Sequence, residues 1–143
     1  MVIREAQKGD IPELAVLMGD LGYPTEEEQM KNRFEKINHD PNYHTLVADE
    51  DGVLLGMVGM FRGYAYEKDE LYVRIIALVV KEEHRNKRIG KQLINSAEEW
   101  AQKQGINKLA VNTGKRRVDS HHFYRSKGFE DTGAGFYKTL QGK

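Results

Sequence analysis

The sequence predicts one mixed domain of the α/β (α+β) class that spans residues 1–143. Two observations support this class. The spacing of apolar residues changes repeatedly between the period of a strand and that of a helix, and no linker, repeat or low-complexity segment interrupts the pattern. The predicted order is β-α-α-β-β-β-α-β-α-β. A chain of 143 residues is also long enough to bury a core of its own.

The first strand and the first helix have recognisable signals. Residues 2–5 alternate apolar and polar side chains, as a strand does. Asp10 then stands where a helix cap accepts backbone hydrogen bonds, and Pro12 suits the first turn. We expect this helix to end at Gly22.

The second helix is predicted to begin with a capping box. In this box Thr25 is the cap and Glu28 is its partner three residues later. Apolar residues at helical spacing follow, and the helix is expected to end before Pro41, because proline disfavours helical geometry in the residue that precedes it.

Strands dominate the middle of the chain. The pair Asp51-Gly52 predicts a tight turn between two hairpin strands. Residues 71–80 form the longest apolar run, which is typical of a strand buried on both faces. From residue 43 onward we expect strands over residues 43–49, 53–61 and 71–80, a helix over 89–104, a strand over 109–113, a helix over 120–127 and a strand over 136–140.

Composition excludes several classes of site. The chain has no cysteine, so it can form neither a disulfide nor a thiolate metal site nor a cysteine nucleophile. Its histidines lack ligand spacing, since the adjacent His121 and His122 would point about 100° apart on a helix, and we expect no metal. No apolar run approaches the ~20 residues of a membrane span, and the first residues do not resemble a signal peptide. We therefore expect a cytoplasmic protein without a membrane partner.

The formal net charge of zero hides an uneven distribution. Residues 1–70 carry 7 basic and 15 acidic side chains, a net −8, whereas residues 71–143 carry 15 and 7, a net +8. Two solvated halves can differ in this way by chance. The functional interpretation is a molecule that presents one face to an anion and another to a cation.

The most informative segment joins the apolar strand ending at residue 80 to the helix that begins near residue 89. Free backbone N–H groups and the helix dipole make such a helix start an anion site, and Arg85, Lys87, Arg88 and Lys91 add positive charge. An ordinary exposed turn with solvated charges is the alternative from the local pattern alone. The segment matches neither the Walker motif nor the glycine fingerprint of dinucleotide-binding folds.

Two motifs together resemble the GNAT superfamily of N-acetyltransferases. Leu78-x-Val80 followed by Arg85-x-x-Arg88-x-Gly90 resembles that family's acyl-CoA-binding motif, usually written Arg/Gln-x-x-Gly-x-Gly/Ala. Residues 123–129, Phe-Tyr-Arg-Ser-Lys-Gly-Phe, resemble its late tyrosine helix. Within the superfamily, residues 40–42, 117–124 and 136–140 look most like the small-amine branch, which includes aminoalkylphosphonate and aminoglycoside acetyltransferases.

The resemblance implies a mostly antiparallel sheet flanked by helices and splayed between its fourth and fifth strands, where acetyl-CoA would bind as cosubstrate. Backbone groups of Leu78 and Val80 would hold the pantetheine and the thioester oxygen. Arg88 departs from the motif because it replaces the first glycine. Its backbone either takes positive φ, at the cost of strain, or takes negative φ while the loop still wraps the phosphate and Arg88 contributes a charge. The residues implied in cofactor binding are Leu78, Val80, Arg85, Asn86, Lys87, Arg88, Ile89, Gly90, Lys91 and Asn112.

The catalytic chemistry implied by the resemblance is incomplete in this sequence. Tyr124 matches the general acid that protonates the departing CoA thiolate. Related small-amine enzymes often carry a carboxylate on the fourth strand, but Arg74 and Ala77 occupy the corresponding region here. Asp69, Glu70 or a chain of water molecules remain as routes for the proton of the amine. Carboxylates and tyrosines suited to an ammonium group also occur, namely Tyr23, Glu26, Glu27, Glu28, Tyr64 and Tyr66.

We therefore predict an N-acetyltransferase that moves the acetyl group of acetyl-CoA directly to a primary amine of a small molecule. The alternatives are a non-catalytic acyl-CoA-binding module or sensor, and an enzyme that acetylates a protein N-terminus or lysine. The basic group over residues 115–127 would suit a phosphate, whereas zero net charge and the absence of interleaved aromatics argue against nucleic acid. A homodimer is possible, because dimers are common in the superfamily.

Overall fold

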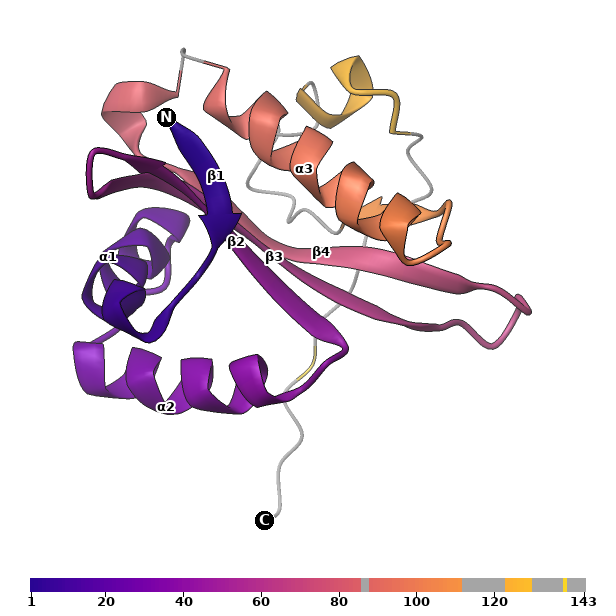
Figure 1. Cartoon of the computed structure of the whole chain (residues 1–143), viewed down its shortest axis with the longest axis horizontal. Coiled ribbons are helices and arrows are strands. Elements are labelled where there is room, and N and C mark those ends of the chain that lie inside the picture. Colours follow the sequence, from indigo (N-terminus) through magenta and orange to yellow (C-terminus); the bar gives the residue numbers. More distant parts are fainter. Residues whose placement is uncertain (86–87, 112–122, 130–137, 139–143) are drawn as a thin grey trace.

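The computed structural model describes residues 1–85, 88–111, 123–129 and 138. One sheet contains five strands in their sequence order (Figure 1). Three long helices and two short 3-10 helices, η1 and η2, accompany it in the described ranges. The elements are β1 Val2–Glu5, η1 Lys8–Asp10, α1 Ile11–Leu21, α2 Glu27–His39, β2 Tyr43–Glu50, β3 Val53–Tyr64, β4 Leu71–Val80, η2 Glu82–His84, α3 Ile89–Lys103 and β5 Leu109–Val111.

The sheet is mixed and mostly antiparallel, as expected. β1 to β4 pair antiparallel in succession, whereas β5 pairs parallel to β4. Asp51 and Gly52 form the predicted turn between β2 and β3, and both have positive φ, as a type I′ hairpin turn requires. The hairpin of β3 and β4 is longer than predicted on the β3 side and extends beyond the helices at one end of the sheet (Figure 1).

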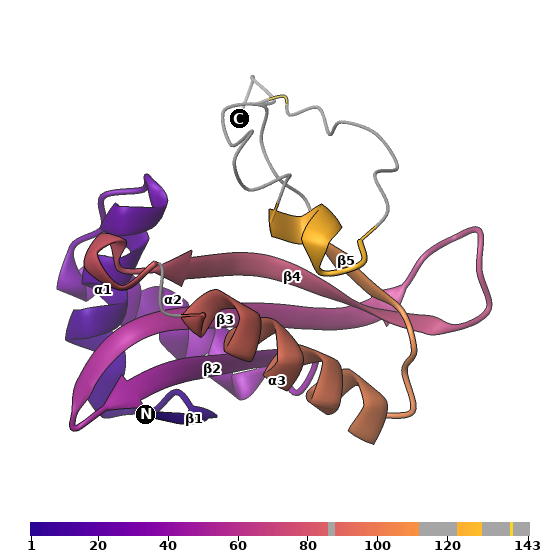
Figure 2. The same cartoon turned by 90° about the horizontal axis from the view of Figure 1, so that it is seen from above.

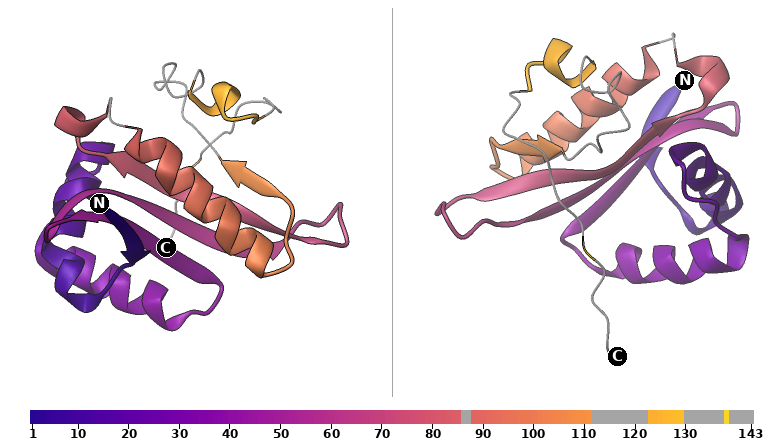
Figure 3. Two further views of the ribbon diagram at one scale, coloured as in Figure 1. Left: turned by 45° about the horizontal axis from the view of Figure 1, so that its top comes forward. Right: turned by 180° about the vertical axis from the view of Figure 1, so that it is seen from behind.

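Helices cover both faces of the sheet. α3 lies across one face, and α1 and α2 lie on the other (Figures 1, 2 and 3). Two clusters of buried side chains follow from this arrangement. The cluster beneath α3 includes Val58, Val73 and Leu93, and the cluster beneath α1 and α2 includes Leu17 and Val47. Burial of these apolar groups contributes the main driving force for the fold.

Two helix starts differ from the prediction. Asp10 does not cap α1 with its side chain; its carboxylate instead accepts hydrogen bonds from the Gln7 N–H and the Arg4 guanidinium. The second helix begins one residue later than expected, and the Glu26 N–H donates to Gln29 Oε1 at 2.9 Å. The predicted box at Thr25 was wrong because that hydroxyl donates to the carbonyl of Tyr23, 2.7 Å away.

β4 is only partly buried, although its apolar run suggested burial on both faces. Val73, Ile75 and Val79 are buried, whereas Ile76 keeps 49% of its surface exposed. Ile76 is the extra residue of a β-bulge, which takes it out of the regular alternation of the strand. Residues 123–126 are helical as predicted, while the beginning of that helix and most of the predicted strand over residues 136–140 lie outside the described residues.

Candidate active site

A β-bulge interrupts β4 in the middle of its length. Ile75 lies opposite Met60 and Ala77 opposite Gly59, so Ile76 is an extra residue. Successive residues of a strand alternate in the direction of their backbone groups and side chains, and one extra residue therefore reverses the alternation beyond it. The bulge decides which residues in the second half of β4 turn their backbone groups away from β3.

Leu78 and Val80 are those residues. The Lys81 N–H donates to the carbonyl of Leu55 at 2.9 Å, which makes Lys81 and every second residue before it the partners of β3. Leu78 and Val80 belong to the alternate set, and the Val80 carbonyl accepts a hydrogen bond from Arg85 Nε at 3.2 Å. In the described part of the chain, β5 pairs with β4 only as far as residue 75. The edge of β4 beside Leu78 and Val80 is thus where the splay was expected.

Arg88 immediately precedes α3 and adopts a left-handed conformation, with φ 61° and ψ 19°. Glycine takes this conformation without strain, whereas a residue with a Cβ does not. The sequence left two alternatives for the Arg88 backbone, and the structure decides for positive φ. Arg88 therefore has the backbone that glycine would supply and adds an exposed guanidinium beside the helix start.

The first turn of α3 is anchored by its own side chains. Ile89 is fully buried in the core beneath the helix, whereas Lys91 is exposed. Gly90 faces inward: a Cβ on this residue would lie 3.4 Å from Phe123 Cζ and 3.8 Å from Val80 Cγ2. Gly90 thus lies where the helix start, the end of β4 and the segment over residues 123–129 pack together. Asn86, Lys87 and Asn112 lie outside the described residues.

Tyr124 lies within this packed group. Its ring meets the rings of Phe123 and Phe129 edge to face, with centroids 5.3 and 5.6 Å away. The short helix ends at Gly128, whose φ of +88° reverses the chain, and the Phe129 N–H donates to the Tyr124 carbonyl. Lys127 Nζ donates to Asn95 Oδ1 at 3.1 Å and fixes the segment to α3. The segment that carries Tyr124, the predicted acid, therefore packs against α3, the helix that begins at the predicted cofactor loop.

The face of β4 that points away from α3 carries the positively charged side chain of Arg74. Val73 and Ile75 belong to the core beneath α3, so the alternation places Tyr72 and Arg74 on the other face. Arg74 Nη2 donates to the Tyr72 hydroxyl at 3.3 Å, and the guanidinium lies 5.4 Å from the centre of that ring. Beyond the bulge, Ala77 shares this face, because it packs against the core beneath α1 and α2. Sequence reasoning noticed the missing carboxylates but missed the arrangement of Arg74 and Tyr72, since the bulge has no sequence signal.

Several other residues considered for the amine or its proton lie at the opposite end of β4 from Leu78. Tyr64 and Tyr66 are exposed near the tip of the β3–β4 hairpin. Asp69 and Glu70 precede β4, so a strand rise of about 3.3 Å per residue places them roughly 25 Å from Leu78. Neither carboxylate can take a proton directly from an amine beside Leu78. Glu26, Glu27 and Glu28 cap and begin α2, where the helix dipole favours acidic side chains.

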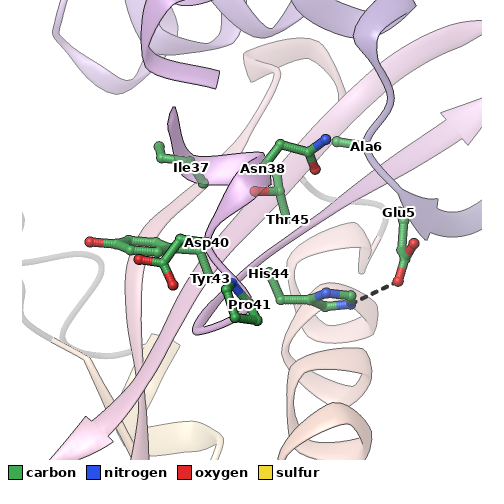
Figure 4. A pocket seen from close by; sticks show the side chains of 9 residues that line it. All are labelled: Glu5, Ala6, Ile37, Asn38, Asp40, Pro41, Tyr43, His44 and Thr45. Atoms are coloured by element: carbon green, nitrogen blue, oxygen red, sulfur yellow. Dashed lines mark ion pairs between the residues drawn. The ribbon is translucent and has the colours of Figure 1, made fainter. Parts of the chain in front are cut away.

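A separate cavity of about 250 Å³ lies at the ends of β1 and α2 and the start of β2 (Figure 4). The His44 imidazole beside it stacks parallel to the Trp100 ring at 4.8 Å. Burial lowers the pKa of His44, and the Glu5 carboxylate, 3.6 Å from Nε2, partly opposes this shift. The lining residues, none of them predicted from sequence, are Glu5, Ala6, Ile37, Asn38, Asp40, Pro41, Tyr43, His44 and Thr45.

The described part of the chain holds neither a metal-ligand cluster nor a candidate membrane span. No three histidine, aspartate or glutamate side chains in that part of the chain are grouped so that they could hold a metal ion. No helix there has the length and apolar character needed to cross a membrane.

The chain matches the Acetyltransferase (GNAT) family over residues 11–129. It is 32% identical over 101 residues to the aminoalkylphosphonate N-acetyltransferase of Salmonella typhimurium, which corresponds to 71% of this chain and 66% of that protein, a little less than two thirds of its length.

Solved structures are similar over nearly the whole chain. A GNAT family acetyltransferase of Staphylococcus aureus superposes with a TM-score of 0.84 at 31% identity, over 97% of this chain and 98% of that one. An aminoglycoside N-acetyltransferase in complex with CoA superposes with a TM-score of 0.86 at 21% identity, over 98% and 94%, and at that identity shows the fold alone. The motifs at the end of β4 and at the start of α3 thus lie in a matching fold, and the chain belongs to the GNAT family of acetyltransferases.

Proposed function

We propose that this chain transfers the acetyl group of acetyl-CoA directly to a primary amine of a small molecule. The observation that carries the proposal is the junction of β4 and α3. There the bulge turns backbone groups of Leu78 and Val80 toward the expected splay, next to a helix start surrounded by positive charge. The Salmonella relative's name supports an amine of small size.

The start of α3 is suited to the diphosphate of CoA. The first N–H groups of a helix lack partners within the helix and attract anions. Arg85, Arg88 and Lys91 are exposed around this helix start and would add charge. As the resemblance implies, we also propose Asn86 and Lys87 for this set and Asn112 as a partner of the pantetheine.

The transfer itself needs few protein groups. The nitrogen lone pair attacks the thioester carbonyl carbon, the C–S bond breaks, and the electron pair leaves with sulfur as a thiolate. A backbone N–H of the splayed β4 edge would stabilise the developing oxyanion. Tyr124 would give its phenolic proton to the thiolate and would be reprotonated, through solvent, by the proton that the attacking nitrogen loses as it becomes an amide. No cysteine is present to carry the acetyl group, which favours direct attack.

The proton of the substrate ammonium must leave by another route. We call the face of β4 that points away from α3 the acceptor face, because the amine would bind there. It presents Tyr72, Arg74 and Ala77, none of which is a carboxylate. Asp69 and Glu70 are too distant along the strand for direct transfer. We therefore propose that water molecules relay this proton to bulk solvent, where the cell's buffers accept it.

The test is acetyl-CoA turnover across a panel of primary amines, followed by release of the free CoA thiol. We expect turnover with at least one small amine, and we expect Tyr124→Phe to reduce kcat roughly 10²- to 10⁴-fold, the usual contribution of a positioned acid. The affinity for CoA and the thermal midpoint should be preserved in this variant. CoA binding without any turnover would contradict the proposal and favour a non-catalytic sensor, whereas acetylation of peptides alone would favour a protein acetyltransferase.

A further inference from the structure

The acceptor face of β4 holds a guanidinium where an amine-binding site would be expected to hold acids. Arg74 is half-buried on this face, and its side chain lies against Tyr72. Neither the hydrogen bond to the Tyr72 hydroxyl nor the contact with the Tyr72 ring neutralises the positive charge of Arg74. Within the described residues no carboxylate lies within ion-pair distance of Arg74, in contrast to Arg4, which is paired with two aspartates.

The surroundings of Arg74 are suited to a short organic molecule. Phe61 lies directly across from Arg74 on β3 and packs against Tyr43, with ring centroids 5.0 Å apart. The side chains of Tyr43, Phe61 and Tyr72 are half-buried, and strand register and alternation place them on the same face of the sheet as the guanidinium. Arginine binds phosphonate and carboxylate groups through two parallel hydrogen bonds, which gives it specificity as well as charge.

The position of Arg74 relative to the reacting centre is also suitable. It precedes Leu78 by four residues, so the two backbones are at most about 13 Å apart, and the bulge shortens this distance. A molecule whose amine reaches the thioester beside Leu78 can extend along the same face of β4 toward Arg74. An anionic group at the far end would then lie near the guanidinium.

We propose that Arg74 is a specificity-determining residue and that the acceptor is a short-chain amine carrying an anionic group, a phosphonate or a carboxylate. This inference rests on the proposed acetyl transfer to a small amine. The same charge repels polycations, so the chain discriminates against acceptors with several amines and no anion, such as aminoglycosides. Arg74 would thus select acceptors in two ways, by attracting an anionic group and by repelling additional ammonium groups.

The experiment compares four acceptors in steady-state acetylation: 2-aminoethylphosphonate, 3-aminopropanoate, propylamine and kanamycin. We expect kcat/KM to be roughly 10- to 100-fold higher for one or both anionic amines than for propylamine, in line with a charge-assisted hydrogen bond to arginine. The first two acceptors distinguish phosphonate from carboxylate. In Arg74→Met this advantage should disappear through a higher KM for the anionic amine, and Arg74→Lys should restore part of it.

Arg62→Met is the matched control. Arg62 is on the other strand of the same hairpin, opposite Val73, and its guanidinium bonds Asn42 and Gln104 on the α3 side of the sheet. The control removes the same charge and should leave the preference among the four acceptors intact. Equal use of propylamine and the anionic amines by the wild type, or a preference that survives Arg74→Met, would overturn the inference.

A second measurement separates this inference from the proposed function. Binding of 2-aminoethylphosphonate and 3-aminopropanoate is measured by calorimetry in the presence of CoA, without turnover. Binding that depends on Arg74 in a protein that acetylates nothing would support the anion site and contradict the enzyme. Turnover of amines with no binding dependent on Arg74 would support the enzyme and overturn the anion site.

Discussion

Gly90 in the first turn of α3 turns its empty side-chain position toward Phe123, at 3.4 Å from Cζ. This contact brings the start of α3 against the segment that carries Tyr124, the proposed acid. The contact has consequences for substitutions at position 90.

Gly90→Glu is expected to abolish CoA binding. The carboxylate has no room beside Phe123 and would be forced toward the bound phosphates, where like charges 4 Å apart repel by roughly 4 kcal/mol at an effective dielectric of 20. Titration calorimetry with CoA measures the loss. Gly90→Ala is the control, because its methyl group meets only ordinary van der Waals contacts and should retain binding. Retained affinity in Gly90→Glu would refute the phosphate-loop assignment.

Arg88→Gly is expected to stabilise the protein and at the same time weaken CoA binding. Relief of the left-handed strain at φ 61° should raise the free energy of unfolding by about 1 kcal/mol. Arg88→Ala keeps the strain and removes the charge. Denaturant unfolding should therefore separate the two variants, whereas their losses in CoA affinity should be similar. If Arg88→Gly gains no stability over Arg88→Ala, the strain is not significant.

Gly56→Ala is expected to destabilise the end of the sheet by about 1–3 kcal/mol. A Cβ there would lie 2.7 Å from the Val79 carbonyl oxygen, a backbone atom that cannot move aside without disturbing β4 next to Val80. Gly59→Ala in the same strand meets no atom closer than 3.7 Å and should unfold like the wild type. Thermal unfolding of the two variants tests this difference, and equal midpoints would contradict it.

His44 is expected to make stability depend on pH below neutrality. Burial lowers the pKa of His44 in the folded protein below that in the unfolded chain, near 6.5. Its neutral form is favoured by the fold, so this stability is complete above pH 6.5 and is lost as pH falls toward the folded pKa. Unfolding free energies between pH 7 and 5 should decrease more steeply in the wild type than in His44→Gln. Parallel curves for the two proteins would exclude this role.

Much of the fold was predictable because its signals are local. Pro12 and Gly22 bracket α1 correctly, and β4 has the predicted bounds, because helical spacing, turn residues and apolar runs act within a few residues. The predicted box at Thr25 failed by one position for a different reason. Thr25 is the better cap by residue type, but its hydroxyl donates to the Tyr23 carbonyl, and the box forms one position later, at Glu26.

The sequence by itself determined the order of the elements, the basic segment before α3 and the two motifs that identify the family. Tertiary structure alone decided which side chains and backbone groups share a face. Ile76 is an extra residue only with respect to its pairing with β3, and that pairing places Arg74 on the face away from α3 and turns the backbone groups of Leu78 away from β3. The stacking of His44 on Trp100 likewise joins residues 56 positions apart. Such relationships depend on strand register and packing, which no local pattern contains.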